Sequence, residues 1–166
     1  MSVRNMSFAD IVRMYQQPLY WYIRRVVIVH EDAEDILQET FMKAYKHLWQ
    51  LRSPESLRPW MYRIATNELN RYFRKRTPIT ALEGLPGDTV SDFSESQDTN
   101  TIGSSSKVIS KAMLKMSPLQ RQVFSMRYYD DLGYDQISKI TGATKNTLMV
   151  SYHEARKRIE KEIENE

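Results

Sequence analysis

Three stretches of the sequence carry side chains whose types and spacing suit the binding of a charged partner. In the first, Trp60 to Arg76, aromatic residues alternate with arginine and lysine. Aromatic rings stack on unpaired bases while guanidinium groups neutralise phosphates, so this composition suits single-stranded nucleic acid. The alternative is that the rings, above all Trp60 and Phe73, belong to the core and that the cations solvate a helix end. The basic side chains are therefore the better candidates for contacts with DNA.

The second stretch has the pattern of a helix-turn-helix. A short apolar segment, Asp135–Thr141, is followed by Gly142, which is a natural helix stop, and by a longer segment that starts at Thr144. Such a turn lets the second helix enter a major groove. The candidate DNA contacts are Lys145, Asn146, Thr147, Met149, Val150, His153 and Arg156. A three-helix bundle with the same turn and no role in DNA binding is the alternative.

The third stretch, His30–Trp49, has an acidic first half. Glu34, Asp35, Gln38 and Glu39 fall on the polar side of a helix whose other side is apolar. A dense acidic face of this kind is usually only a solvated surface. The other interpretation is a docking face for a basic partner.

Helices must position these stretches, and the spacing of apolar residues predicts them. Apolar positions three or four apart indicate helices near 8–19, 32–49, 57–75, 108–116, 118–129, 135–141 and 144–164. Pro18 is expected to kink or interrupt the first helix, and Tyr45 is expected in the apolar stripe of the second. Because no stretch alternates with a period of two for long, the fold is predicted to be all-α.

Charge divides the chain into three parts. Residues 1–76 carry a formal net charge of +5, residues 77–106 carry −5 and residues 107–166 carry +3. We predict a helical N-terminal domain at 1–76, a flexible acidic linker at 77–106 and a C-terminal helix-turn-helix domain at 107–166. The two basic blocks suggest two modules that meet polyanions.

Composition argues against several classes of protein. No apolar run approaches 18 residues and the N-terminus lacks a secretory pattern, so neither a membrane span nor secretion is expected. The absence of cysteine excludes disulfides and thiolate metal sites and fits a reducing cytoplasm. The histidines are scattered, and neither a phosphate-cradling loop nor a nucleophile with its base is present. An enzyme, a metal site and any other cofactor are therefore not expected.

Two motifs, in order, resemble the extracytoplasmic-function sigma factors of bacterial RNA polymerase. The run Asp32–Phe41 followed by Trp60–Asn67 is similar to their first domain. The run Ser117–Phe124, followed by Gly133–Ile137 and the turn described above, is similar to their second. The resemblance covers nearly the whole chain. It implies a protein that is not an enzyme but binds core RNA polymerase, directs it to promoters and helps to melt promoter DNA.

The resemblance also implies roles for the three stretches. Glu34, Asp35, Gln38 and Glu39 would dock on the clamp helices of the largest polymerase subunit. The minus-ten element would be held by the loop near Leu51–Leu57 and by Arg58, Trp60, Arg63, Asn67, Arg71, Arg74 and Lys75. The C-terminal domain would contact the minus-thirty-five element and the flap of the second-largest subunit, with the acidic linker in the polymerase channels. An anti-sigma factor is a further expected partner.

The second helix of the helix-turn-helix, which would read the minus-thirty-five element, departs from the family pattern. Met149, Val150 and Ser151 stand where basic residues are common, and Gly133 stands where a capping serine is usual. Met149 and Val150 are candidates for contacts with thymine methyl groups. Two other functions stay open from the residues alone. A stand-alone helix-turn-helix regulator would bind duplex DNA tightly without polymerase, whereas a helical adaptor would show no salt-dependent association with DNA.

Overall fold

The computed structural model describes residues 6–76 and 104–165, and within these ranges every regular element is a helix, as predicted. The N-terminal group contains α1 (Phe8–Val26), α2 (His30–His47), η2 (Leu48–Gln50), η3 (Pro54–Ser56) and α3 (Leu57–Arg74). The C-terminal group contains α6 (Ser104–Leu114), α7 (Pro118–Phe124), η4 (Ser125–Tyr129), α8 (Tyr134–Thr141) and α9 (Lys145–Glu164). Most of the expected linker lies outside the described residues, and α6 already includes 104–106.

Local hydrogen bonds fix where several helices begin. Ser117 and Gln120 form the predicted capping box of α7, in which each side chain accepts the backbone N–H of the other residue at 3.2 Å. Ser7 caps α1 in the same way through Asp10. Thr144 accepts the N–H of Thr147 at 3.2 Å and so caps α9, as its position in the sequence predicted.

Two predictions about helix shape were wrong or incomplete. Helix α1 continues through Pro18 without interruption and ends only at Val26. Pro18 is exposed, so the carbonyl that its missing N–H leaves unpaired faces water, while buried neighbours hold the helix to the core. The helical segment that begins at Pro118 does end at Tyr129, as predicted. Its last turn, η4, is however a π-helix and not an α-helix.

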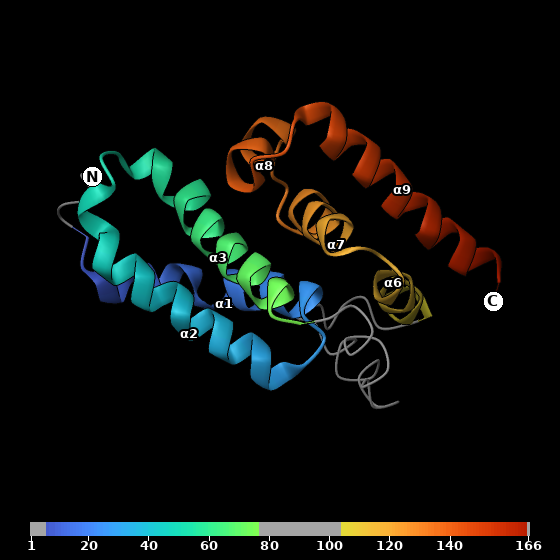
Figure 1. The fold of residues 1–166 in the computed structure, drawn as a ribbon, viewed down its shortest axis with the longest axis horizontal. Coiled ribbons are helices and arrows are strands. Elements are labelled where there is room, and N and C mark those ends of the chain that lie inside the picture. Colours follow the sequence, from blue (N-terminus) through green and yellow to red (C-terminus); the bar gives the residue numbers. More distant parts are fainter. Residues whose placement is uncertain (1–5, 77–103, 166) are drawn as a thin grey trace.

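The two groups of helices share one hydrophobic core. Figure 1 shows α1–α3 on one side and α6–α9 on the other, with α3 and α8 side by side at the boundary. Ile11, Tyr22 and Leu69 from the first group belong to the same buried cluster as Met126 and Ile137 from the second. A smaller cluster around Phe124 and Ala155 lies wholly within the C-terminal group. The predicted modules are therefore packed against each other in this conformation.

Gly142 makes the turn between α8 and α9 possible. It has a φ of +80°, and its N–H donates to the carbonyl of Ser138 at 2.8 Å. We expect Gly142→Ala to lower the free energy of unfolding by about 1 kcal/mol, because a β-carbon disfavours this left-handed conformation. A β-carbon there would meet nothing within 4 Å, so the loss comes from the backbone alone. Urea unfolding measures it, and Gly142→Asn, which tolerates the left-handed region better, should lose less. Equal losses for both variants would contradict this explanation.

Candidate nucleic-acid interface

A basic stripe follows the outer face of α3. Arg63, Asn67, Arg71 and Arg74 are three or four residues apart, so they line one side of the helix, and all are exposed. Arg58 and Lys75, at the two ends of the helix, are exposed as well. Trp60 is partly buried and packs against the core, as does Phe73. The helix thus presents its cations to solvent and most of its rings to the interior.

The acidic residues of α2 form a second exposed surface. Glu34, Asp35, Gln38 and Glu39 all face solvent, while Ala33 and Ile36 on the other side are buried. Glu34 lies 3.2 Å from His30, and the Nδ1 atom of His30 lies 2.6 Å from the hydroxyl of Tyr20. The first half of α2 therefore offers carboxylates that are available to a basic partner.

The second half of the exposed α2 face is apolar. Met42 and Tyr45 of α2 and Trp49 of the following η2 are 46%, 67% and 78% exposed. The prediction that Tyr45 belongs to the core was wrong. Its ring reaches only the edge of Phe8, with 5.2 Å between centroids, because α1 and α3 already cover the opposite side of α2. The sequence period placed Tyr45 beside Phe41 but could not show which edge of the stripe stays uncovered.

The acidic and basic surfaces meet in a shallow groove between α2 and α3. Asp35, Glu39, Arg71 and Lys75 line this groove. At its end Asp32 accepts a 2.7 Å hydrogen bond from the hydroxyl of Tyr72 and forms an ion pair with Arg76. These contacts fix the spacing between the two helices, so the position of the basic stripe depends on that of the acidic face.

Helix α9 exposes one side of its first three turns to solvent. All seven residues predicted to contact the minus-thirty-five element are exposed: Lys145, Asn146, Thr147, Met149, Val150, His153 and Arg156. Leu148, Ser151 and Ala155 are buried and anchor the opposite side. At 3.6 residues per turn, Asn146, Val150 and His153 point most directly outward.

Two of the seven residues are already engaged within the protein. The ammonium group of Lys145 pairs with Asp135 on α8 and lowers the pKa of that carboxyl. The hydroxyl of Thr147 lies 2.9 Å from that of Thr144 in the cap of α9. The structure therefore separates outward-facing candidates from candidates that also hold the turn.

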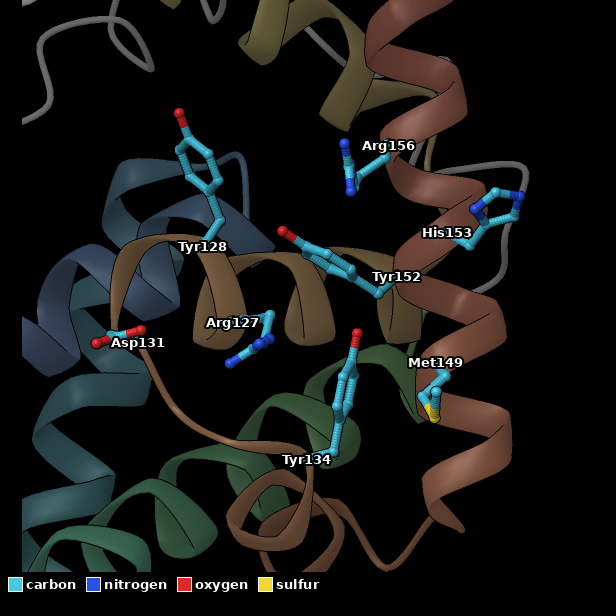
Figure 2. A pocket seen from close by; sticks show the side chains of 8 residues that line it. All are labelled: Arg127, Tyr128, Asp131, Tyr134, Met149, Tyr152, His153 and Arg156. Atoms are coloured by element: carbon cyan, nitrogen blue, oxygen red, sulfur yellow. The ribbon is translucent and has the colours of Figure 1, made fainter.

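An open cavity of about 600 Å³ lies beside α9 and adds residues that sequence reasoning missed. Figure 2 shows Arg127 of η4 and Arg156 of α9 on either side of the Tyr152 ring, with Tyr134 nearby. The Arg127 guanidinium lies 5.0 Å from the centroid of Tyr134. Two guanidinium groups among tyrosine hydroxyls form a surface that suits phosphate. The local signal for it was the adjacent pair Arg127 and Tyr128, whereas Tyr134 and Tyr152 come from α8 and α9.

A further contact joins the two groups of helices at the end of η4. The guanidinium of Arg58 donates to the backbone carbonyl of Asp130, and the Asp130 side chain is largely buried beside Tyr62. Burial raises the pKa of Asp130 to about 6, although Arg25 and Arg58 act in the opposite direction. One predicted minus-ten contact, Arg58, is therefore held by the other module in this conformation.

Neither a metal site nor a membrane span is found in the part of the chain that the structure describes. No group of three or more histidine, aspartate or glutamate side chains among these residues could hold a metal ion. None of the described helices combines the length and the apolar character needed to cross a bilayer.

Two family models match the chain in the order that the sequence motifs predicted. The model for sigma-70 region 2 matches residues 11–79, and the model for sigma-70 region 4 matches residues 106–159. The RNA polymerase sigma factor YlaC of Bacillus subtilis is 29% identical over 162 residues, which are 95% of this chain and 92% of that protein. The ECF RNA polymerase sigma factor SigW of the same organism is 29% identical over 166 residues, with 95% and 89% covered.

Solved structures share the same fold. The sigma factor RpoE of Bartonella quintana, in complex with the anti-sigma factor NepR, has a TM-score of 0.72 at 20% identity and covers 95% of this chain and 96% of its own. CnrH, in complex with the cytosolic domain of CnrY, has a TM-score of 0.67 at 18% identity, with 96% and 88% covered. The paired region 2 and region 4 matches, together with the exposed surfaces on the helices that carry them, show that the chain belongs to the extracytoplasmic-function sigma factors, which direct RNA polymerase to promoters.

Proposed function

We propose that the exposed surfaces on α2, α3 and α9 divide the work of promoter recognition between them. The observation that carries the proposal is that these surfaces differ in charge. Helix α2 has an acidic face and α3 a basic stripe, whereas α9 has a reading edge, formed by the outward-facing Asn146, Val150 and His153. The predicted domains, 1–76 and 107–166, would each supply part of the promoter contact. The protein acts by binding and positioning, in the cytoplasm, with no chemical step of its own.

The acidic face of α2 docks on the clamp helices of the largest polymerase subunit. Its four residues, Glu34, Asp35, Gln38 and Glu39, are exposed and lie on one side of a helix whose opposite side is buried at Ala33, Ile36, Thr40 and Ala44. Complementary charge steers such an encounter and selects against wrong partners. A contact between the region 4 module and the flap of the second-largest subunit completes the complex.

The basic stripe of α3 holds the melted strand of the minus-ten element. Arg63, Arg71 and Arg74 neutralise phosphates, and Asn67 lies between them with its amide free to face a base. Trapping of bases that have left the stack offsets the cost of melting, which is a few kcal/mol for each base. Arg58 joins this surface when it is released from Asp130.

The reading edge of α9 selects the minus-thirty-five element. We expect Asn146→Ala and His153→Ala each to reduce transcription from a dependent promoter about tenfold, since a good base contact contributes about 1–3 kcal/mol. Lys145→Ala and Thr147→Ala should weaken promoter binding too, but part of their effect arises from the contacts to Asp135 and Thr144. Run-off transcription measures the change, with the exposed Lys161→Ala at the far end of α9 as the matched control.

The decisive test of the proposed function is run-off transcription with core polymerase on genomic fragments. The protein should start transcripts at discrete sites that share upstream sequence, whereas the free protein should show little specific binding. This is expected because each module binds DNA weakly and gains affinity only when both are joined on the polymerase. Tight, specific binding of duplex DNA by the free protein would instead indicate a stand-alone regulator.

An anti-sigma factor is the further partner that we propose. The structural relatives RpoE and CnrH were each solved in complex with another protein, in the first case an anti-sigma factor. The fold is shared over nearly the whole chain, which supports a similar interaction here. Co-purification with such a partner, and loss of run-off transcription when it is added, would test this proposal.

A further inference from the structure

The open cavity beside α9 has the size and the lining of a site for a small ligand. Its volume of about 600 Å³ falls within the range of roughly 300–1,000 Å³ that is common for ligand pockets. The residues that line it come from η4, from the segment after η4, and from α8 and α9, so it lies wholly within the C-terminal group (Figure 2). The function proposed above uses only Met149, His153 and Arg156 of this lining.

Part of the lining is aromatic. Tyr128 stacks on Phe124 with 5.0 Å between ring centroids, and Tyr152 stacks on the same ring at 5.9 Å. Tyr134 meets the ring of Tyr152 edge to face at 6.4 Å. Phe124 is buried and fixes the planes of its neighbours, whereas the Tyr128 ring is 55% exposed. Rings held in this way offer flat surfaces on which a nucleotide base can stack.

Two guanidinium groups line the same cavity. Arg127 is held in place, because it donates to the carbonyl of Leu132 at 3.3 Å and lies 5.0 Å from the centroid of the Tyr134 ring. Arg156 is exposed on α9. Neither arginine forms an ion pair with an acidic side chain in the described part of the chain. Guanidinium groups without such a partner are suited to bind phosphate oxygens through paired hydrogen bonds.

Asp131 makes the cavity unlike a plain contact for the DNA backbone. Its side chain is exposed and lines the cavity. A carboxylate there repels a bare phosphate but can accept hydrogen bonds from the hydroxyl groups of a ribose. DNA lacks the 2′-hydroxyl. One carboxylate beside two guanidinium groups therefore favours a ribonucleotide over the deoxyribose backbone.

The backbone around the cavity is unusual in two adjoining places. η4, which supplies Arg127 and Tyr128, is a π-helix, a form found frequently at functional sites. Asp131 has a φ of +54°, and it is the only residue other than glycine with a positive φ in the described ranges. This left-handed conformation costs free energy, and such outliers cluster at ligand-binding sites. Both features bring their side chains to the same cavity.

We infer that this cavity binds a soluble ribonucleotide. The base stacks on the tyrosine rings, the phosphates lie between Arg127 and Arg156, and the ribose hydroxyls donate to Asp131. Because Met149, His153 and Arg156 line the cavity and are also predicted contacts with the minus-thirty-five element, a bound nucleotide competes with promoter DNA for α9. Nucleotide binding is independent of the proposed function, whereas its effect on promoters rests on that function.

Isothermal titration calorimetry of the full-length protein with ADP tests the site. ADP should bind about tenfold more tightly than either pyrophosphate or adenosine, because each of these lacks half of the contacts. 2′-Deoxy-ADP should bind more weakly than ADP, because it has one hydroxyl fewer for Asp131. The absence of saturable ADP binding at millimolar concentrations would overturn the inference. Binding of pyrophosphate as tight as that of ADP would also overturn it, since it would indicate a simple anion contact.

Two variants locate the binding. Arg127→Gln should weaken ADP binding about tenfold, whereas Arg158→Gln should change it less than about twofold. The control removes the same charge from an exposed position of α9 that does not line the cavity. Asp131→Gly keeps the backbone conformation, since glycine adopts a positive φ without strain, and should abolish the preference for ADP over 2′-deoxy-ADP. Equal losses in Arg127→Gln and Arg158→Gln, or an unchanged preference in Asp131→Gly, would contradict the assigned contacts.

The effect on promoters is measured with the protein bound to core polymerase and no nucleoside triphosphates present. Fluorescence anisotropy of a labelled promoter fragment should show that saturating ADP weakens binding about tenfold. The Asp131→Gly complex should respond less, which separates this site from nucleotide binding by the polymerase itself. Unchanged promoter binding while ADP occupies the site would refute the competition. No specific promoter binding even without ADP would instead refute the proposed function.

Discussion

Reversing the charge of two residues, Glu34→Lys with Asp35→Lys, should weaken binding to core RNA polymerase about a hundredfold. The two carboxylates lie on the exposed acidic face of α2, and like charges placed against a basic partner cost several kcal/mol, of which about 3 kcal/mol corresponds to this factor. The fold should persist, because both side chains are exposed and the ion pair of Glu34 with His30 lies at the surface. Competition for core polymerase against a labelled sigma factor measures the change.

The charge-matched control is Glu160→Lys with Glu164→Lys, two exposed residues near the end of α9. It changes the net charge equally but leaves α2 intact, so binding to core polymerase should stay within about twofold of the unmodified protein. Equal losses in both double variants would mean that net charge, and not the α2 face, governs docking. Circular dichroism establishes that each variant keeps its helices.

Replacing Arg121 with methionine should lower the free energy of unfolding by about 3 kcal/mol. The guanidinium donates to the carbonyls of Met113 at 2.8 Å, Leu114 at 3.1 Å and Val26 at 3.0 Å. These carbonyls end α6 and α1, where the negative ends of two helix dipoles meet one cation. Methionine fills the space but leaves buried acceptors unpaired, at about 1–3 kcal/mol each before relaxation.

Thermal unfolding followed by circular dichroism measures this loss, which should lower Tm by about 10 °C for a chain of this size. Burial lowers the pKa of Arg121 to about 10, so the guanidinium is charged at neutral pH and the effect needs no adjustment of pH. Arg158→Met, an exposed change on α9, should shift stability by less than about 0.5 kcal/mol. A Tm for Arg121→Met within 2 °C of this control would show that water replaces the guanidinium at little cost.

The limits of several helices were predictable because their signals are local. The capping box of Ser117 and Gln120, the stop at Gly142 and the cap at Thr144 each involve atoms within four residues of one another. The alternative that Pro18 interrupts the first helix was wrong for the opposite reason. Whether a proline interrupts a helix depends on whether its unpaired carbonyl faces water and on what holds the flanking turns, and both are set by packing.

Surfaces were predictable as patterns but not in their extent. The period of α2 placed its acidic residues on one side, and they are exposed. The same period placed Tyr45 in the core, although its neighbours leave most of the ring in solvent. A helical stripe shows which residues share a side, whereas the width of the buried part depends on the helices that cover it.

The sequence by itself determined an all-helical chain, its sigma-factor motifs and the order of its acidic, basic and reading stretches, because periodicity, capping and motif spacing are properties of neighbouring residues. Only the tertiary structure decided that region 2 and region 4 share one core and that Arg121 joins the ends of α6 and α1. It also decided that Asp130 holds Arg58. These contacts join residues as far as 95 positions apart. No local pattern encodes them, because they depend on how whole helices pack and on which polar groups that packing excludes from water.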